Sequence, residues 1–72
     1  GGRVPAGDRT LCLCLGLSAT LEETQELLKH GGFAQLYAKN RRDAIIMYGL
    51  SQGVELREIN DRLYAEKEET LC

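Results

Sequence analysis

Apolar residues follow one another along this chain in short runs that predict helices. Residues 11–17, LCLCLGL, are apolar at every position, and residues 44–50, AIIMYGL, are almost wholly apolar. Taken alone, the first run fits a strand, because leucine alternates with a smaller residue, and it equally fits one buried helix of a small bundle. The second run follows Asn40, a good helix cap, and precedes Gly53, a residue that can end a helix. The separation between this cap and this glycine is the length of a helix rather than of a strand.

Four helices are predicted from capping residues, glycine stops and the spacing of leucines. The clearest start is Thr20-Leu21-Glu22-Glu23, a capping box in which the Thr20 hydroxyl and the Glu23 carboxylate each accept a backbone N–H. We expect Phe33 and Tyr37 to anchor the linker between the second and third helices, and the charged residues 66–69 to form a solvated tail. In chain order, the predicted boundaries are Asp8 to Gly16, Thr20 to Gly31, Asn40 to Gly53 and Glu55 to Ala65.

The sequence also repeats itself with a shift of 35 residues, which brings Asp8 onto Asp43 and Leu15 onto Leu50. A repeat of this length predicts a two-helix unit used twice. Because the second apolar run reads as a helix, the first run, LCLCLGL, should be helical as well. The alternative is a chance similarity between two segments rich in leucine and glutamate.

The predicted fold is therefore all-α, a small bundle of four to five short helices built from two related helical hairpins. Residues 1–36 would form the first hairpin with an N-terminal turn, and residues 37–72 the second hairpin with an acidic tail, within one compact domain. The apolar helices should pack centrally, and the acidic helices should cover them.

Length and charge bear on the partners of the chain. A domain of 72 residues has a small core, so we expect a second copy to cover part of residues 11–17 or the region of Tyr37 and Tyr48, which predicts a homodimer. The formal net charge of -2 argues mildly against a chain built mainly to coat nucleic acid.

The residue types of catalytic and metal sites are sparse. Three cysteines and a single histidine, His30, do not give the spacing of a metal site, so no metal and no cofactor is expected. Cys12 and Cys14 read as small buried residues in a reducing cytoplasm. The apolar run of residues 11–17 is too short for a membrane span, and no catalytic motif is present, so neither membrane insertion nor enzyme activity is expected.

Six residues are candidates for contacts with nucleic acid or an acidic partner. Three lie at the start of the third predicted helix and three on the fourth, where arginine, lysine and asparagine could meet phosphate or carboxylate groups. The alternative is that these charges are solvated and pair with the neighbouring acidic helices. The candidates are Lys39, Arg41, Arg42, Arg57, Asn60 and Arg62.

The last two helices also have the spacing of a helix-turn-helix. Gly49, Gly53 and Ile59 stand where that motif needs a small residue, a turn glycine and an aliphatic packing residue. However, Glu58 and Asp61 would face the phosphates of a DNA duplex, which opposes binding. The hairpin therefore reads mainly as a packing device, with direct DNA binding as the alternative.

Three stretches of the chain, LGLSATLEETQELLKHGGF, LYAKNRRDAIIMYGL and REINDRLYAE, resemble the C-terminal part of bacterial XRE-family (Cro/repressor-type) helix-turn-helix regulators. The resemblance covers roughly residues 3–71. It implies membership in a transcription-regulator family through a helical extension that binds protein partners or a second copy. The upstream recognition helix of the family has no counterpart in this sequence, so the resemblance places DNA contacts outside this chain.

Overall fold

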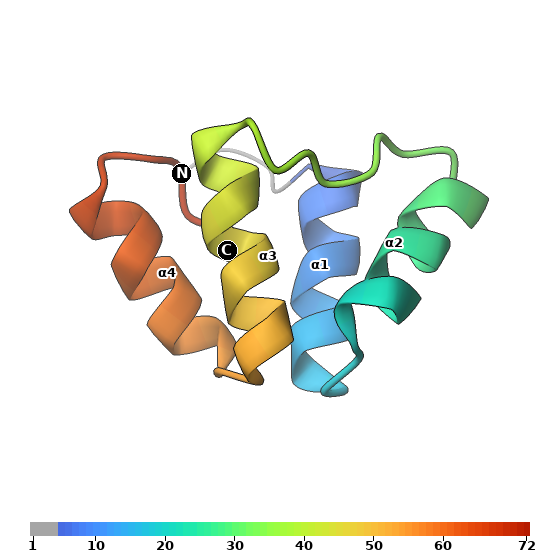
Figure 1. Cartoon of the computed structure of the whole chain (residues 1–72), viewed down its shortest axis with the longest axis horizontal. Coiled ribbons are helices and arrows are strands. Elements are labelled where there is room, and N and C mark those ends of the chain that lie inside the picture. Colours follow the sequence, from blue (N-terminus) through green and yellow to red (C-terminus); the bar gives the residue numbers. More distant parts are fainter. Residues whose placement is uncertain (1–4) are drawn as a thin grey trace.

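The computed structural model describes residues 5–72 as four helices, α1 (Ala6–Gly16), α2 (Leu21–His30), α3 (Arg41–Gln52) and α4 (Leu56–Ala65) (Figure 1). The predicted all-α bundle is therefore confirmed, and no strand occurs in this part of the chain. Residues 1–4, which belong to the predicted N-terminal turn, lie outside the description. None of the helices in residues 5–72 has the length and apolar character to cross a membrane.

The predicted helix starts are confirmed at α2 and α3 and wrong at α1. In the capping box, the Thr20 N–H donates to Glu23 Oε1 (2.8 Å) and the Glu23 N–H donates to the Thr20 hydroxyl (3.0 Å). Asn40 caps α3 as expected. At α1 the N-cap is Pro5, not Asp8, because the fixed φ of proline, here -58°, suits a helix entry. Asp8 lies in the first turn, where a carboxylate is favourable to the helix dipole.

Burial follows the 35-residue repeat through the whole described chain. The two helices of the first half and the two helices of the second half begin 35 residues apart. Every buried residue has a buried counterpart at the same offset, so both halves put the same six positions into one core. These pairs are Leu11 with Ile46, Cys14 with Gly49, Leu15 with Leu50, Thr24 with Ile59, Leu28 with Leu63, and Leu36 with Leu71.

The backbone turns recur at the same offset. Ser18 (φ 56°) and Gly53 (φ 69°) adopt the left-handed conformation after the first helix of each half, and Gly32 (φ 78°) and Lys67 (φ 60°) do so after the second. Only glycine adopts this conformation without steric cost, so Ser18 and Lys67 are held there by the surrounding fold.

An amide side chain on the second helix of each half fixes the segment that follows. Gln25 accepts a hydrogen bond from the Leu36 N–H (2.8 Å) and donates one to the Leu36 carbonyl (2.9 Å). Asn60 accepts from the Leu71 N–H (2.7 Å) and donates to the carbonyl of the next residue, Cys72 (3.3 Å). Each amide therefore holds a buried leucine against the core. The charged residues of the tail are mostly exposed as predicted, but the tail turns back at Leu71.

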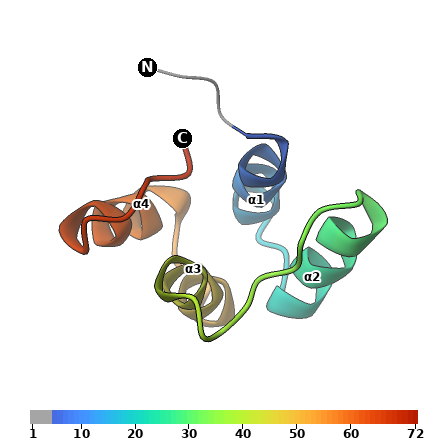
Figure 2. The ribbon, with the colours of Figure 1, turned by 90° about the horizontal axis from the view of Figure 1, so that it is seen from above.

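The helices form a closed circuit. Close backbone approaches join α1 to α2, α2 to α3, α3 to α4, and α4 back to α1. The apolar helices α1 and α3 stand between α4 and α2 in Figure 1, yet each packs against both amphipathic helices rather than chiefly against the other apolar one. Figure 2 shows the segment after α4 returning toward α1.

The α3–α4 hairpin has the close approach that the helix-turn-helix spacing predicted. A Cβ atom on Gly49 would lie 2.4 Å from Ile59 Cδ1 and 2.5 Å from its Cγ1. Ile59 is itself buried, so it has little room to move. The matching positions in the first half hold Cys14 and Thr24, so a larger residue on the first helix goes with a smaller one on the second.

We predict that Gly49→Ala lowers the free energy of unfolding by about 1–3 kcal/mol, because the added methyl overpacks the core. Gly16→Ala is the matched control, since its Cβ would meet nothing within 4 Å. Alanine should be neutral or slightly stabilising there. Urea unfolding followed by circular dichroism measures both.

A second comparison tests the size compensation. The pair Gly49→Cys with Ile59→Thr copies the first half and should unfold at higher urea than Gly49→Cys alone. Equal midpoints for these two variants would contradict the packing argument.

Candidate interaction site

Of the six predicted contact residues, the structure brings Arg41 and Arg62 to one groove between α3 and α4. Lys39, Arg41, Arg57 and Arg62 are exposed, and they are distributed over the start of α3 and along α4. The other two, Arg42 and Asn60, are engaged in contacts inside the fold. Glu58 and Glu66 line the groove together with Arg41 and Arg62, so it is not the purely basic patch that follows a nucleic-acid backbone.

Arg42 joins three separate parts of the chain. Its guanidinium makes a bidentate ion pair with Asp8 on α1, with Nη2 2.9 Å from Oδ2 and Nη1 3.3 Å from Oδ1. Its Nε donates to the Glu69 carbonyl at 2.8 Å, and Nη2 donates to the Thr70 carbonyl at 3.4 Å. The Arg42 and Asp8 side chains are only 22% and 14% exposed. This arginine is a structural tie between α1, α3 and the tail.

Asn60 is likewise committed to the tail through the amide contacts described above. The repeat offered a signal for this role, because Asn60 matches Gln25, another short amide on the second helix of a hairpin. Its hydrogen bonds to Leu71 and Cys72 leave its side chain occupied rather than free for a base or a phosphate.

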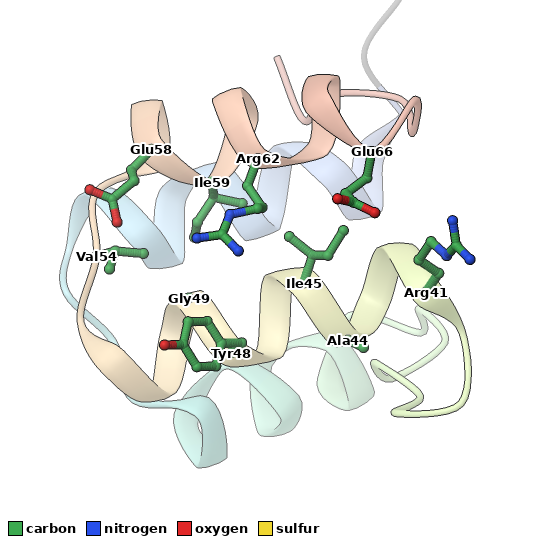
Figure 3. Close-up of a pocket in the computed structure, with 10 residues that line it drawn as sticks. All are labelled: Arg41, Ala44, Ile45, Tyr48, Gly49, Val54, Glu58, Ile59, Arg62 and Glu66. Atoms are coloured by element: carbon green, nitrogen blue, oxygen red, sulfur yellow. The ribbon is translucent and has the colours of Figure 1, made fainter.

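A groove of about 270 Å³ lies between α3 and α4. Figure 3 shows the Arg62 side chain extending from α4 toward α3, with Glu58 on the same helix to one side and Glu66, the residue after the helix, to the other. Tyr48, 60% exposed, lines the groove as well. The mixture of both charge signs makes this groove a weak attractor for either a polyanion or a polycation.

Three leucines of the first hairpin are exposed to solvent. Leu13, Leu17 and Leu27 are 63%, 78% and 50% exposed, and we call these three residues the leucine face. Leu17 and Leu27 line the same shallow hollow together with Ala19. Leu13 lies one helical turn before Leu17, so it extends the same side of α1.

Acidic side chains border the leucine face. Glu22, Glu23 and Glu26 line the hollow next to Leu17 and Leu27. His30 adjoins this border, with its Nε2 3.4 Å from Glu26 Oε2 in an exposed pair. An exposed pair of this kind is screened by water and contributes little to stability. The site is thus apolar at its centre and negative at its edge.

The fold itself does not require these leucines. The repeat places Tyr48, Gln52 and Arg62 at the positions that match Leu13, Leu17 and Leu27. The second hairpin keeps the same helices and the same buried positions with polar or aromatic residues there. Packing therefore explains the buried leucines of the first hairpin and leaves its exposed ones without a structural role.

Several burial predictions need correction. Residues 11–17 were expected to lie in a buried central helix with part of its surface covered by a second copy; within the chain only Leu11, Cys14 and Leu15 are buried, since one side of α1 faces solvent. Tyr37 does not anchor the linker, because it is 59% exposed. The polar residues Gln52 and Arg62 in the second hairpin were the signal in the sequence that the matching leucines are exposed.

No group of three or more acidic, histidine or cysteine side chains within residues 5–72 is placed to hold a metal ion. Comparison of the chain with protein-family models, curated proteins and solved structures found no significant match.

We predict that Arg42→Ala lowers the free energy of unfolding by about 1–3 kcal/mol, because it leaves the half-buried Asp8 carboxylate without its partner. Arg41→Ala, one residue earlier and exposed, is the matched control and should change stability by less than about 0.5 kcal/mol. Thermal and urea unfolding measure both variants. Equal stability of the two would show that the tie between α1, α3 and the tail contributes nothing.

Proposed function

We propose that this chain is a helical protein-interaction module that binds its partner through the leucine face. The observation that carries the proposal is the exposure of Leu13, Leu17 and Leu27, three large apolar side chains on one hairpin. Burying apolar surface contributes roughly 25 cal/mol for each Å² removed from water. Adjacent exposed leucines that the core does not need are typical of a binding surface.

The acidic border defines the chemistry of the partner. Two leucine faces brought together would set Glu22, Glu23 and Glu26 of one copy against the same residues of the other, and like charges at an interface oppose association. We therefore propose a partner whose apolar contact residues are flanked by lysine or arginine, such as an amphipathic helix with basic edges. A homodimer would instead use the region of Tyr37 and Tyr48.

The leucine face and the sequence resemblance together support a place for the chain in a bacterial cytoplasmic regulator of the XRE helix-turn-helix type. In that setting the module binds protein, and DNA is contacted by residues outside this 72-residue chain. This assignment is a proposal that rests on the three matching stretches of sequence.

Direct DNA binding by the α3–α4 hairpin is the second candidate. Two features favour it, because both belong to the geometry of a helix-turn-helix. Gly49 packs closely against Ile59, and the backbone of Gly53 is left-handed. The occupied Arg42 and Asn60 oppose it.

We predict that a synthetic amphipathic helix of about 18 residues, with leucines on one side and lysines at the edges, binds the chain. Leu17→Asp and Leu27→Asp should each weaken this binding about tenfold or more, because they place a charge in the apolar centre. Tyr64→Asp is the matched control. Tyr64 lies on α4 and is 79% exposed, so this substitution adds the same charge away from the leucine face. Fluorescence anisotropy at physiological salt measures the affinities.

The charge of the edge is tested with the same peptide carrying glutamate in place of lysine, which should bind more weakly. If the Leu17→Asp chain binds the lysine peptide as tightly as Tyr64→Asp does, the leucine face is not the binding surface. Sedimentation of the wild-type and the Leu17→Asp chains without peptide then reports whether self-association uses the face.

The two candidate functions differ in their response to salt. We predict that a labelled DNA duplex binds the chain weakly and that its affinity changes little with salt concentration. Binding driven by phosphate contacts would instead weaken strongly as salt rises. Titrations from about 50 to 200 mM salt cover the range in which that loss is large. Tight binding that declines steeply over this range, and that Arg57→Ala and Arg62→Ala reduce, would favour the DNA-binding candidate.

A further inference from the structure

Two of the three cysteines meet at the junction between the tail and α1. Cys12 Sγ on α1 lies 2.8 Å from Cys72 Sγ, although the residues are 60 positions apart in the chain. Cys12 is half-buried and Cys72 is exposed, whereas the third cysteine, Cys14, is fully buried. The two sulfurs of a disulfide are about 2.05 Å apart, so the thiols need to approach by less than about 1 Å.

The tail is held at this place by contacts that do not involve sulfur. Leu71, next to Cys72, is 1% exposed in the core. Asn60 binds the backbone of both residues, and Arg42 binds the carbonyls just before them. Both cysteines are therefore brought together by the fold before any bond forms between them, which lowers the entropic cost of forming it.

The repeat shows that packing does not need thiols at these two positions. The residues that match Cys12 and Cys72 in the other half are Met47 and Tyr37, which cannot be cross-linked in this way. The helices and buried positions are the same in both halves. The pairing of two cysteines is thus a chemical difference between the halves rather than a requirement of the architecture.

We propose that Cys12 and Cys72 are a reversible dithiol–disulfide pair, oxidised by a low-molecular-weight disulfide such as glutathione disulfide. The Cys72 thiolate attacks one sulfur of the oxidant, whose S–S bond breaks and releases one glutathione thiolate. The Cys12 thiol then gives up its proton as its sulfur attacks the Cys72 sulfur of the mixed disulfide, and the second glutathione leaves as a thiol. Two protein thiols become one disulfide, and one glutathione disulfide becomes two thiols.

The surroundings of the sulfurs fix the order of these two steps. Burial raises the pKa of the Cys12 thiol to about 12, and the Cys72 contact, the Cys72 charge and the Asp8 charge act in the same direction. At neutral pH Cys12 is therefore protonated and a poor first nucleophile. The exposed Cys72 is the thiol that meets the oxidant, and Cys12 is the one that resolves the mixed disulfide.

The test uses the whole 72-residue chain with glutathione disulfide, followed by mass spectrometry and thermal unfolding. We expect the wild type to lose the mass of two hydrogens, to give a Cys12–Cys72 cross-linked peptide on digestion, and to unfold about 5 °C or more higher. Dithiothreitol should reverse all three changes. Cys14→Ser should behave as the wild type does.

Cys12→Ser separates the two steps, because it should stop at a glutathione adduct on Cys72 without the rise in unfolding temperature. Cys72→Ser should gain neither the adduct nor the cross-link in its folded form. The proposal is overturned if the wild type accumulates only the glutathione adduct, or cross-links only between two chains.

Discussion

Burial of Leu36 and Leu71 is the contact on which the rest of this structure depends. Each leucine lies in an irregular segment after an amphipathic helix, so its position is not set by helix periodicity. The amides of Gln25 and Asn60 hold the backbone there and satisfy polar groups that would otherwise be costly to place beside a core. With both leucines in place, each hairpin presents a completed apolar side to the other.

The helical architecture could be predicted from the sequence because its signals are local. The Thr20–Glu23 capping box, the Asn40 cap and the Gly53 stop depend on residues within a few positions of one another, and the structure contains all three. Three of the six repeated core positions hold leucine in both halves, which made the offset of 35 residues visible. The start of α1 was missed because Asp8 resembles a cap in sequence while its carboxylate serves Arg42.

The functional surface was harder to predict because it depends on distant contacts. Arg42 reads as a free cation until α1 and the tail are placed beside it. In the same way, Leu27 reads as a core residue from its helical spacing alone, and only its repeat partner Arg62 indicates that it is exposed. The meeting of Cys12 and Cys72 follows only from the path of the tail.

The contact of α4 with α1 completes a cycle, so the fold has no intrinsic first or last helix. The approach of α4 to α1 is the counterpart, under the repeat, of the approach of α2 to α3. A chain that ran α3, α4, α1, α2 would contain the same set of neighbours, with the connection simply moved to the other junction. The architecture is in this sense a pair of hairpins fused into one polypeptide, and two separate hairpins bound to each other would have the same topology.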